Sequence, residues 1–186
     1  MDDPVIQKLI KKYGDLTWNK KEINLFESLI ESIISQQLSI KASDTIFSRF
    51  KNLFKAFPTP KEILKTSDEK LRSVGLSGSK AKYIKSLSEF IEKKDLVLEN
   101  LKNLEDEEVI TELTKVKGIG RWTAEMILIF TLRRPDIFSI GDLALRKAVS
   151  RLYSVDINDL AKIKKISLKW IPYRSTASRY LWKSLE

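Results

Sequence analysis

Apolar residues recur every three and four positions along most of the chain, an interval that places them on one face of an α-helix. Five stretches follow it, namely residues 25–34, 83–91, 109–116, 143–153 and 173–182. Residues 124–132 are apolar on nearly all sides, so we expect a buried central helix there. The sequence has no convincing alternation of the kind that marks a β-strand. The pattern therefore predicts an all-α protein with roughly nine or ten helices.

Residues that start helices agree with this pattern. Thr59 is placed as an N-cap, Pro60 stands in the first turn, and Glu62 completes a capping box. Ser67 and Ser77 are further N-cap candidates, because a short hydroxyl side chain can accept a hydrogen bond from the first free backbone N–H groups of a helix.

Length and composition indicate a folded protein. The 186 residues are enough for one domain or two small lobes, and 42% of them are apolar against 32% charged. No apolar run approaches the length of a membrane span, and the N-terminus does not look like a secretory signal. We therefore expect a soluble, intracellular protein with no membrane partner, in the cytoplasm or nucleoid, or in the nucleus of a eukaryote.

The charge and the missing residue types narrow the chemistry. Lys and Arg number 34 and Asp and Glu 25, and this surplus of nine favours an anionic partner such as nucleic acid, although many basic proteins bind nothing in particular. Cys and His are absent. Disulfides, iron–sulfur clusters, thiol nucleophiles, the usual zinc sites and His-based catalysis are thereby excluded. Any catalysis must use Asp, Glu, Lys, Tyr, Ser or Thr.

A Gly-x-Gly turn between two predicted helices is the first motif with chemical content. One helix is expected to end near Val116 and the next to begin near Arg121, with Gly118 and Gly120 between them. Glycine permits a positive φ and a close backbone approach. Free N–H groups at the start of the second helix would then point outward, with the positive end of the helix dipole behind them, and form a cradle for phosphate. Lys117 and Arg121 flank the turn with positive charge.

A plain αα-hairpin also needs Gly in its turn, so Gly-x-Gly alone is weak evidence. The longer string over residues 113–124 is more specific and resembles the helix-hairpin-helix DNA-binding motif. A looser copy over residues 74–81 is better interpreted as a capped turn between two helices.

Asp142 lies twenty residues after Trp122 and directly before an amphipathic helix, where it is placed as an N-cap. For an arbitrary Asp, stabilising the helix would be the whole role. Here the hairpin, the buried helix, a turn over residues 133–136 and Asp142 follow in the order and spacing of the helix-hairpin-helix DNA glycosylases.

The chain resembles that superfamily over nearly its whole length, and most closely the DNA-3-methyladenine glycosylase II family. Four segments carry the resemblance, namely the N-terminal residues 2–14, the loop at 35–39, the hairpin segment 118–125 and the Pro-Tyr-Arg-Ser element at 172–175. Two departures concern the base that is recognised: Tyr173 stands where these relatives have Trp, and Met126 stands where a pocket Tyr can occur.

The resemblance implies a two-lobed helical fold with the active site in the cleft between the lobes. Residues 21–112 would form the central lobe. Residues 1–20 and 113–186 would form the second lobe, which would carry the hairpin at about residues 110–132 and the catalytic Asp.

The resemblance also assigns chemical roles. Asp142 would be the catalytic carboxylate, whose charge stabilises the cationic sugar and orients water. Relatives with lyase activity carry a Lys at the position of Trp122, so hydrolysis without strand cleavage is implied. Trp122 and Tyr173 would stack on an electron-poor alkylated base, with Met126 also lining the pocket. The other three tryptophans are expected in the core, namely Trp18, Trp170 and Trp182.

DNA contacts follow from the same comparison. Gln37, with Leu38 beside it, would fill the gap left by a flipped base. Further DNA-binding residues are expected in and after the turn, namely Lys117, Gly118, Ile119, Gly120, Arg121 and Thr123. The backbone carbonyls of Val116 and Gly118 would hold a monovalent cation against the phosphate. No other metal and no cofactor is expected.

The sequence thus predicts a monomeric, monofunctional DNA glycosylase that flips an alkylated purine out of double-stranded DNA and excises it by hydrolysis in base excision repair. One alternative is a glycosylase for another lesion, such as uracil or a deaminated purine. A non-catalytic helix-hairpin-helix module would not need Asp142 or an aromatic pocket, and a basic helical scaffold for proteins would not need the Gly-x-Gly cradle.

Overall fold

The computed structural model describes residues 2–18 and 24–186, and these residues contain eleven α-helices, three short helical turns of other types and no β-strand. The expected all-α fold is confirmed. Two helices were indicated neither by hydrophobic spacing nor by the N-cap candidates or the resemblance, namely Ile40–Lys51 and Leu160–Ser167. Both are amphipathic, and the first begins with an exposed Ile40. Among the described residues no helix has the length and apolar character needed to cross a membrane.

The chain divides into two compact units. We call residues 23–127 the central unit and residues 1–22 with 128–186 the terminal unit. The sequence had assigned residues 113–127 to the second lobe, but the structure groups them with the central unit. Packing explains the difference, because the helix after the hairpin packs on the helix before it, and Gly118 packs against Tyr83. The boundary expected between residues 20 and 21 lies outside the described residues.

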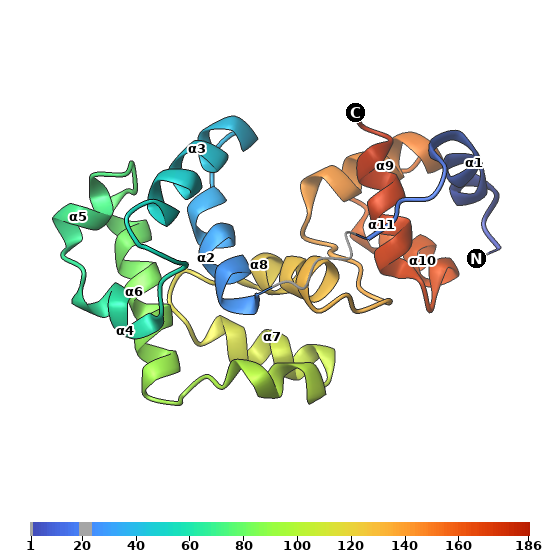
Figure 1. The fold of residues 1–186 in the computed structure, drawn as a ribbon. Helices are drawn as coiled ribbons and strands as arrows, with labels where there is room; N and C mark the ends of the chain where they lie inside the picture. The colour runs from blue at the N-terminus through green and yellow to red at the C-terminus, as the bar shows by residue number, and fades with distance from the viewer. Residues whose placement is uncertain (1, 19–23) are drawn as a thin grey trace. The chain divides into compact units, whose positions relative to one another are not determined.

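The central unit contains most of the helices (Figure 1). They are α2 (Leu25–Ser35), α3 (Ile40–Lys51), α4 (Pro60–Lys65), α5 (Asp68–Arg72), α6 (Gly78–Glu92), the 3₁₀ helix η1 (Leu98–Asn103), α7 (Asp106–Thr114) and α8 (Arg121–Met126). Helix α6 packs against α2, α4 and α5. The capping box at Thr59 is formed, and Ser67 and Ser77 cap α5 and α6 as predicted. The looser Gly copy is therefore a capped turn.

The terminal unit contains α1 (Pro4–Tyr13), α9 (Leu143–Tyr153), α10 (Leu160–Ser167), the 3₁₀ turn η3 (Leu168–Trp170) and α11 (Arg174–Lys183). Helix α11 packs against both α1 and α9 (Figure 1). The core of the unit includes Ile6, Leu145 and Trp170, all fully buried. Burying such large apolar side chains contributes about 1.5–3 kcal/mol each.

The segment predicted as a buried helix over residues 124–132 needs a correction. It is helical, but α8 gives way to a π-helix, η2 (Ile127–Thr131), and the division between the units falls at its first residue. Ala124, Leu128 and Ile129 are fully buried, whereas Phe130 is 41% exposed. A π-helical turn shifts the register of the side chains that follow, and such turns are frequent at functional sites.

Candidate functional site

The hairpin has the geometry that its glycines predicted. Helix α7 ends at Thr114, the turn closes with a hydrogen bond of 3.0 Å from Ile119 N–H to Val116 C=O, and α8 begins at Arg121. Gly118 has a φ of 95°, and a Cβ there would lie 2.3 Å from the ring of Tyr83. Both the backbone angle and the close packing therefore require glycine.

The start of α8 has no side-chain cap. Gly120 is the N-cap residue and has no side chain that could provide one. Lys117 is exposed, whereas Thr123 is 4% exposed, so contact with a phosphate at Thr123 is restricted to its backbone.

Arg121 does not flank the turn as an isolated positive charge. Its guanidinium forms a two-pronged ion pair with Glu107 of α7 and a third hydrogen bond of 3.0 Å to the buried Glu125. Arg121 lowers the pKa of Glu107 by hydrogen bonding and by its charge. Arg121 of α8 thus links this helix to α7, and the link holds the two helices of the hairpin together.

Two side chains that the sequence analysis missed connect the hairpin to the loop at 35–39. Gln36 donates from Nε2 to the C=O of Gly118 at 2.8 Å. Lys80 donates from Nζ to the C=O groups of Ile34 and Gln36, at 2.8 and 2.7 Å. Burial lowers the pKa of Lys80. A positive charge against carbonyls at the C-terminal end of α2 also complements the helix dipole.

The two residues expected to fill the gap left by a flipped base, Gln37 and Leu38, lie in this loop. Gln37 is exposed and has a φ of 57°, and Leu38 is 38% exposed. A non-glycine residue with positive φ costs about 1–3 kcal/mol and persists only where its surroundings hold it. The contacts of Gln36 and Lys80 provide that support.

The aromatic candidates for the base pocket are not buried in the core. Trp122 is 48% exposed and Tyr173 is 50% exposed, whereas Met126 is half-buried. Trp122 and Met126 belong to the central unit and Tyr173 belongs to the terminal unit. An aromatic ring exposed to this extent is available to stack on a ligand.

Asp142 is the N-cap of α9, as predicted, and is only 7% exposed. Its Oδ1 accepts a hydrogen bond of 2.7 Å from the backbone N–H of Leu145. The same oxygen accepts a second bond of 3.1 Å from the indole Nε1 of Trp182 on α11. Trp182 was expected in the core, but it is half-buried, and its polar edge reaches the candidate catalytic group.

Of the other two tryptophans that were expected in the core, one lies there and one does not. Trp170 is fully buried, as predicted. Trp18 is only half-buried, and its ring packs against Phe130 and lies 3.8 Å below the guanidinium of Arg179. Periodicity could not separate these roles, because it reports which face a residue occupies and not what the edge of its ring contacts.

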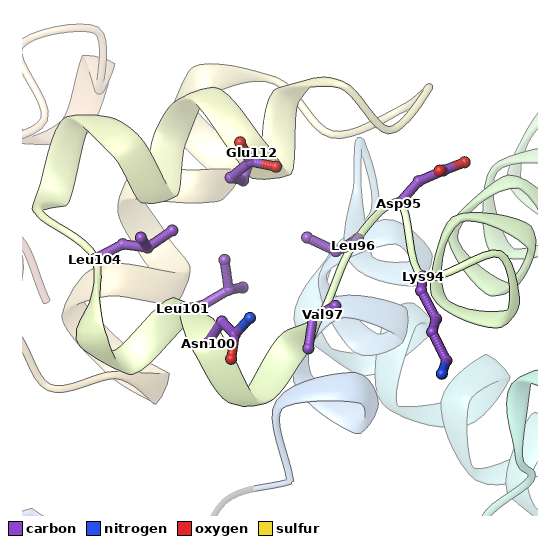
Figure 2. Close-up of a pocket in the computed structure, with 8 residues that line it drawn as sticks. All are labelled: Lys94, Asp95, Leu96, Val97, Asn100, Leu101, Leu104 and Glu112. Atoms are coloured by element: carbon purple, nitrogen blue, oxygen red, sulfur yellow. The ribbon is translucent and has the colours of Figure 1, made fainter.

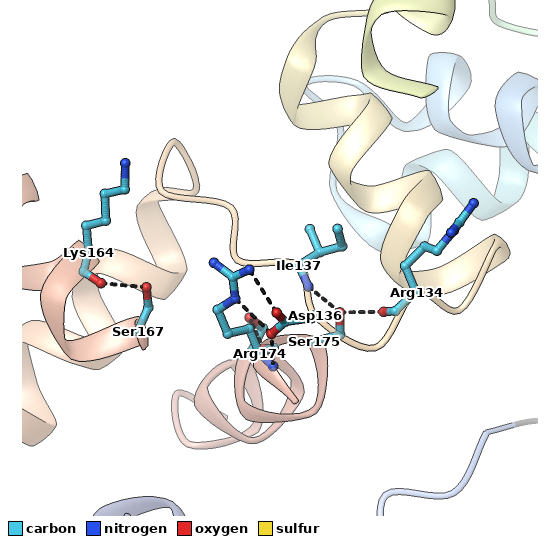
Figure 3. Close-up of polar contacts among 8 residues, drawn as sticks. Arg134, Asp136, Ile137, Lys164, Ser167, Arg174 and Ser175 are labelled. Atoms are coloured by element: carbon cyan, nitrogen blue, oxygen red, sulfur yellow. Dashed lines mark hydrogen bonds and ion pairs between the residues drawn. The ribbon is translucent and has the colours of Figure 1, made fainter. Parts of the chain in front are cut away.

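The Pro-Tyr-Arg-Ser element fixes the turn that precedes Asp142 (Figure 3). Arg174 pairs through two nitrogens with the carboxylate of Asp136, at 2.8 and 2.9 Å. Ser175 Oγ donates to Arg134 C=O at 2.6 Å and accepts from Ile137 N–H at 2.9 Å. Burial alone would raise the pKa of Asp136, but the hydrogen bonds and charge of Arg174 outweigh it and lower that pKa.

A recess of about 260 Å³ lies elsewhere in the central unit, where the segment after α6, η1 and α7 meet (Figure 2). Leu96, Leu101 and Leu104 form its apolar lining, and none of the predicted site residues contributes to it. Among the described residues there is no cluster of three or more acidic side chains that could bind a metal ion.

Two relatives of the chain are named as DNA-3-methyladenine glycosylases. It is 38% identical to "DNA-3-methyladenine glycosylase 1" of Schizosaccharomyces pombe, over 96% of this chain and 81% of that protein. It is 32% identical to "Putative DNA-3-methyladenine glycosylase YfjP" of Bacillus subtilis, over 89% of this chain but 60% of that longer protein.

Solved structures agree. The S. pombe 3-methyladenine DNA glycosylase in complex with abasic DNA superposes with a TM-score of 0.86 at 37% identity, covering 97% of this chain and 91% of that one. A DNA-3-methyladenine glycosidase from Bacillus halodurans gives a TM-score of 0.85 at 37% identity, covering 98% and 84%. The family model of the HhH-GPD superfamily base excision DNA repair proteins matches residues 30–173, and the chain belongs to that family.

Proposed function

We propose that this protein is a monofunctional DNA glycosylase that flips an alkylated purine of the 3-methyladenine type out of duplex DNA and excises it by hydrolysis. The observation that carries the proposal is the carboxylate of Asp142. A backbone N–H and an indole N–H hold this carboxylate at the start of α9. The chain belongs to a family of base excision repair proteins, which supports a role for that carboxylate in excision. The names of the two relatives support the choice of substrate.

The reaction breaks the bond between the base and C1′ of the sugar, and the bonding electron pair leaves with the base. Positive charge then develops on the sugar, as in glycoside hydrolysis. The ionised Asp142 stabilises this charge and orients a water molecule toward C1′. The oxygen of that water forms the new bond, and its proton passes to Asp142 or to solvent. A purine made cationic by alkylation departs as a neutral base, so the reaction needs no strong general acid.

Trp122 stands where a Schiff base would require Lys, so the strand is left intact. We assign Trp122 and Tyr173 to stacking on the flipped base, since an aromatic face attracts an electron-poor or cationic ring. We also assign Met126, which belongs to the same unit as Trp122, to contact with the base. The exposure of both aromatic rings supports these assignments.

We assign DNA binding to the hairpin and to the loop at residues 35–39. The first N–H groups of α8 and the exposed Lys117 would contact a phosphate, and Gln37 with Leu38 would fill the gap in the base stack. The carbonyls of Val116 and Gly118 each accept one hydrogen bond, at 3.0 and 2.8 Å, and each has a second lone pair. They therefore fit a monovalent cation, which when bound would add positive charge beside the phosphate. A monomer is sufficient to bind one lesion in this way.

The test is base release from duplexes that contain 3-methyladenine or 7-methylguanine, under single-turnover conditions, for the parent and for Asp142→Asn. We expect free base from the parent, at least a hundredfold slower release by the variant, and intact strands from both. Both proteins should bind the duplex equally. Release of uracil or hypoxanthine alone would assign another lesion, for which the changes at Tyr173 and Met126 are the first explanation. Firm binding without release from any duplex would overturn the proposal.

A further inference from the structure

Trp182 lies on the third turn of α11, forty residues from Asp142 in the sequence. Its indole Nε1 donates to Asp142 Oδ1 at 3.1 Å, within the normal range for such a bond. The same oxygen receives the N–H of Leu145 at 2.7 Å. Asp142 is therefore oriented from two directions, by the first turn of its own helix and by a second helix packed against it.

The indole is itself held in place. The ring of Trp182 packs on Phe130, with centroids 5.5 Å apart, and Phe130 in turn packs edge-on against Trp18 at 6.2 Å. Arg179 covers Trp18 at 3.8 Å and donates to the C=O of Thr17 at 3.2 Å. All of these residues belong to the terminal unit. The row of rings restricts the side-chain rotation of Trp182, so its N–H stays directed at the carboxylate.

We infer that Trp182 is a positioning residue for Asp142, which goes beyond the assignment of Asp142 and rests on the proposed function. The indole N–H and the backbone N–H of Leu145 hold the same carboxylate oxygen from two sides. Together they select one orientation of the carboxyl group, and a catalytic group must be held within a few tenths of an ångström to act. Since hydrogen bonds to charged groups are the stronger ones, we expect loss of the indole N–H to slow excision about tenfold.

The experiment compares two matched variants. Trp182→Phe removes the donor and keeps an aromatic ring against Phe130. Trp170→Phe removes the equivalent donor to Asp3, a bond of 3.3 Å from a fully buried indole in the same unit. The rate of base release at saturating enzyme, affinity for an abasic duplex and the midpoint of thermal unfolding are measured for the parent and both variants.

We expect Trp182→Phe to lower the maximal rate about tenfold with unchanged DNA affinity, and Trp170→Phe to lower the unfolding midpoint with an unchanged rate. In the Asp142→Asn background, Trp182→Phe should cause no further loss, because the two residues act through one interaction. An unchanged rate in Trp182→Phe, or an additive loss in the double variant, would overturn the inference while leaving the proposed function intact.

If Trp182→Phe does not fold, Phe130→Leu provides the test. It keeps the indole N–H but removes the ring that restrains it, so a smaller fall in rate with unchanged DNA affinity is expected. No fall would overturn the inference. A parent that releases no base from any lesion duplex identifies a failure of the proposed function instead.

Discussion

Two buried aspartates in the terminal unit have nearly the same local structure and different surroundings. Asp3 caps α1 and Asp142 caps α9, each is less than a tenth exposed, and each accepts a hydrogen bond from a tryptophan indole. The indole that reaches Asp3 is that of Trp170, which is 0% exposed. The indole that reaches Asp142 packs instead on Phe130, which is 41% exposed.

The contacts of Asp3 are those of a structural anchor. Its Oδ1 accepts from two backbone N–H groups of α1 and, at 2.8 Å, from the hydroxyl of Tyr153. Its Oδ2 accepts from Trp170. Burial, together with the hydrogen bond and the charge of Asp3, raises the pKa of Tyr153. A helix cap with an indole donor is thus not enough to indicate catalysis. What differs between the two sites is the surroundings of the indole, which is fully buried at Asp3 and packs on the exposed Phe130 at Asp142.

The largest expected effects come from exchanging each carboxylate for an amide. Asp142→Asn should slow base release at least a hundredfold and leave stability almost unchanged, because Asn is also a good N-cap. Asp3→Asn should leave the rate unchanged and cost about 2 kcal/mol, because an amide nitrogen then faces donors in the core. Single-turnover release and urea unfolding of both variants measure the two effects. Equal loss of activity in both variants would remove the distinction.

Gly118 extends the comparison from carboxylates to the backbone. Gly118→Ala should destabilise the protein by about 2 kcal/mol and weaken duplex binding, because its φ is 95° and the added methyl group would meet Tyr83. Gly120→Ala is the matched control for stability, since no atom outside its neighbours lies within 4 Å of an added Cβ. Urea unfolding and titration with an abasic duplex would test both. If Gly118→Ala still bound the duplex tightly, DNA binding would not require this turn geometry.

The carboxylate of Asp136 affects the candidate site only by stabilising the turn that precedes Asp142. Asp136→Asn should lower the free energy of unfolding by about 2 kcal/mol at pH 7, because it removes the pairing with the partly buried Arg174. The folded-state pKa of Asp136 is lowered, so this stabilisation is present above the ordinary carboxyl range near pH 4 and is lost as the pH falls through the folded pKa.

Urea unfolding of the parent and of Asp136→Asn, measured between pH 7 and pH 2.5, would show the effect. The two free energies should converge at the acid end. A constant difference across the whole range would mean that the ionised form of Asp136 is not what stabilises the turn.

The sequence predicted features that depend on neighbours along the chain. The caps at Thr59 and Asp142 and the helix boundaries around Gly118 follow from interactions within about four residues. It did not predict contacts between distant segments. Gln36 meets Gly118 across 82 positions, and this contact helps to place the hairpin in the central unit. Trp182 was expected in the core, although it is half-buried and its indole N–H donates to Asp142, forty residues away in the sequence.

The smallest predicted effect compares the two cations of the hairpin. Lys117→Ala should weaken duplex binding a fewfold and reduce the salt dependence of binding by about one phosphate contact. Arg121→Ala should leave that salt dependence unchanged, because its guanidinium already pairs with Glu107 and Glu125. It should instead loosen the link between α7 and α8. Titrations with an abasic duplex at several salt concentrations distinguish the two, and a larger change in slope for Arg121→Ala would show that DNA displaces the glutamates.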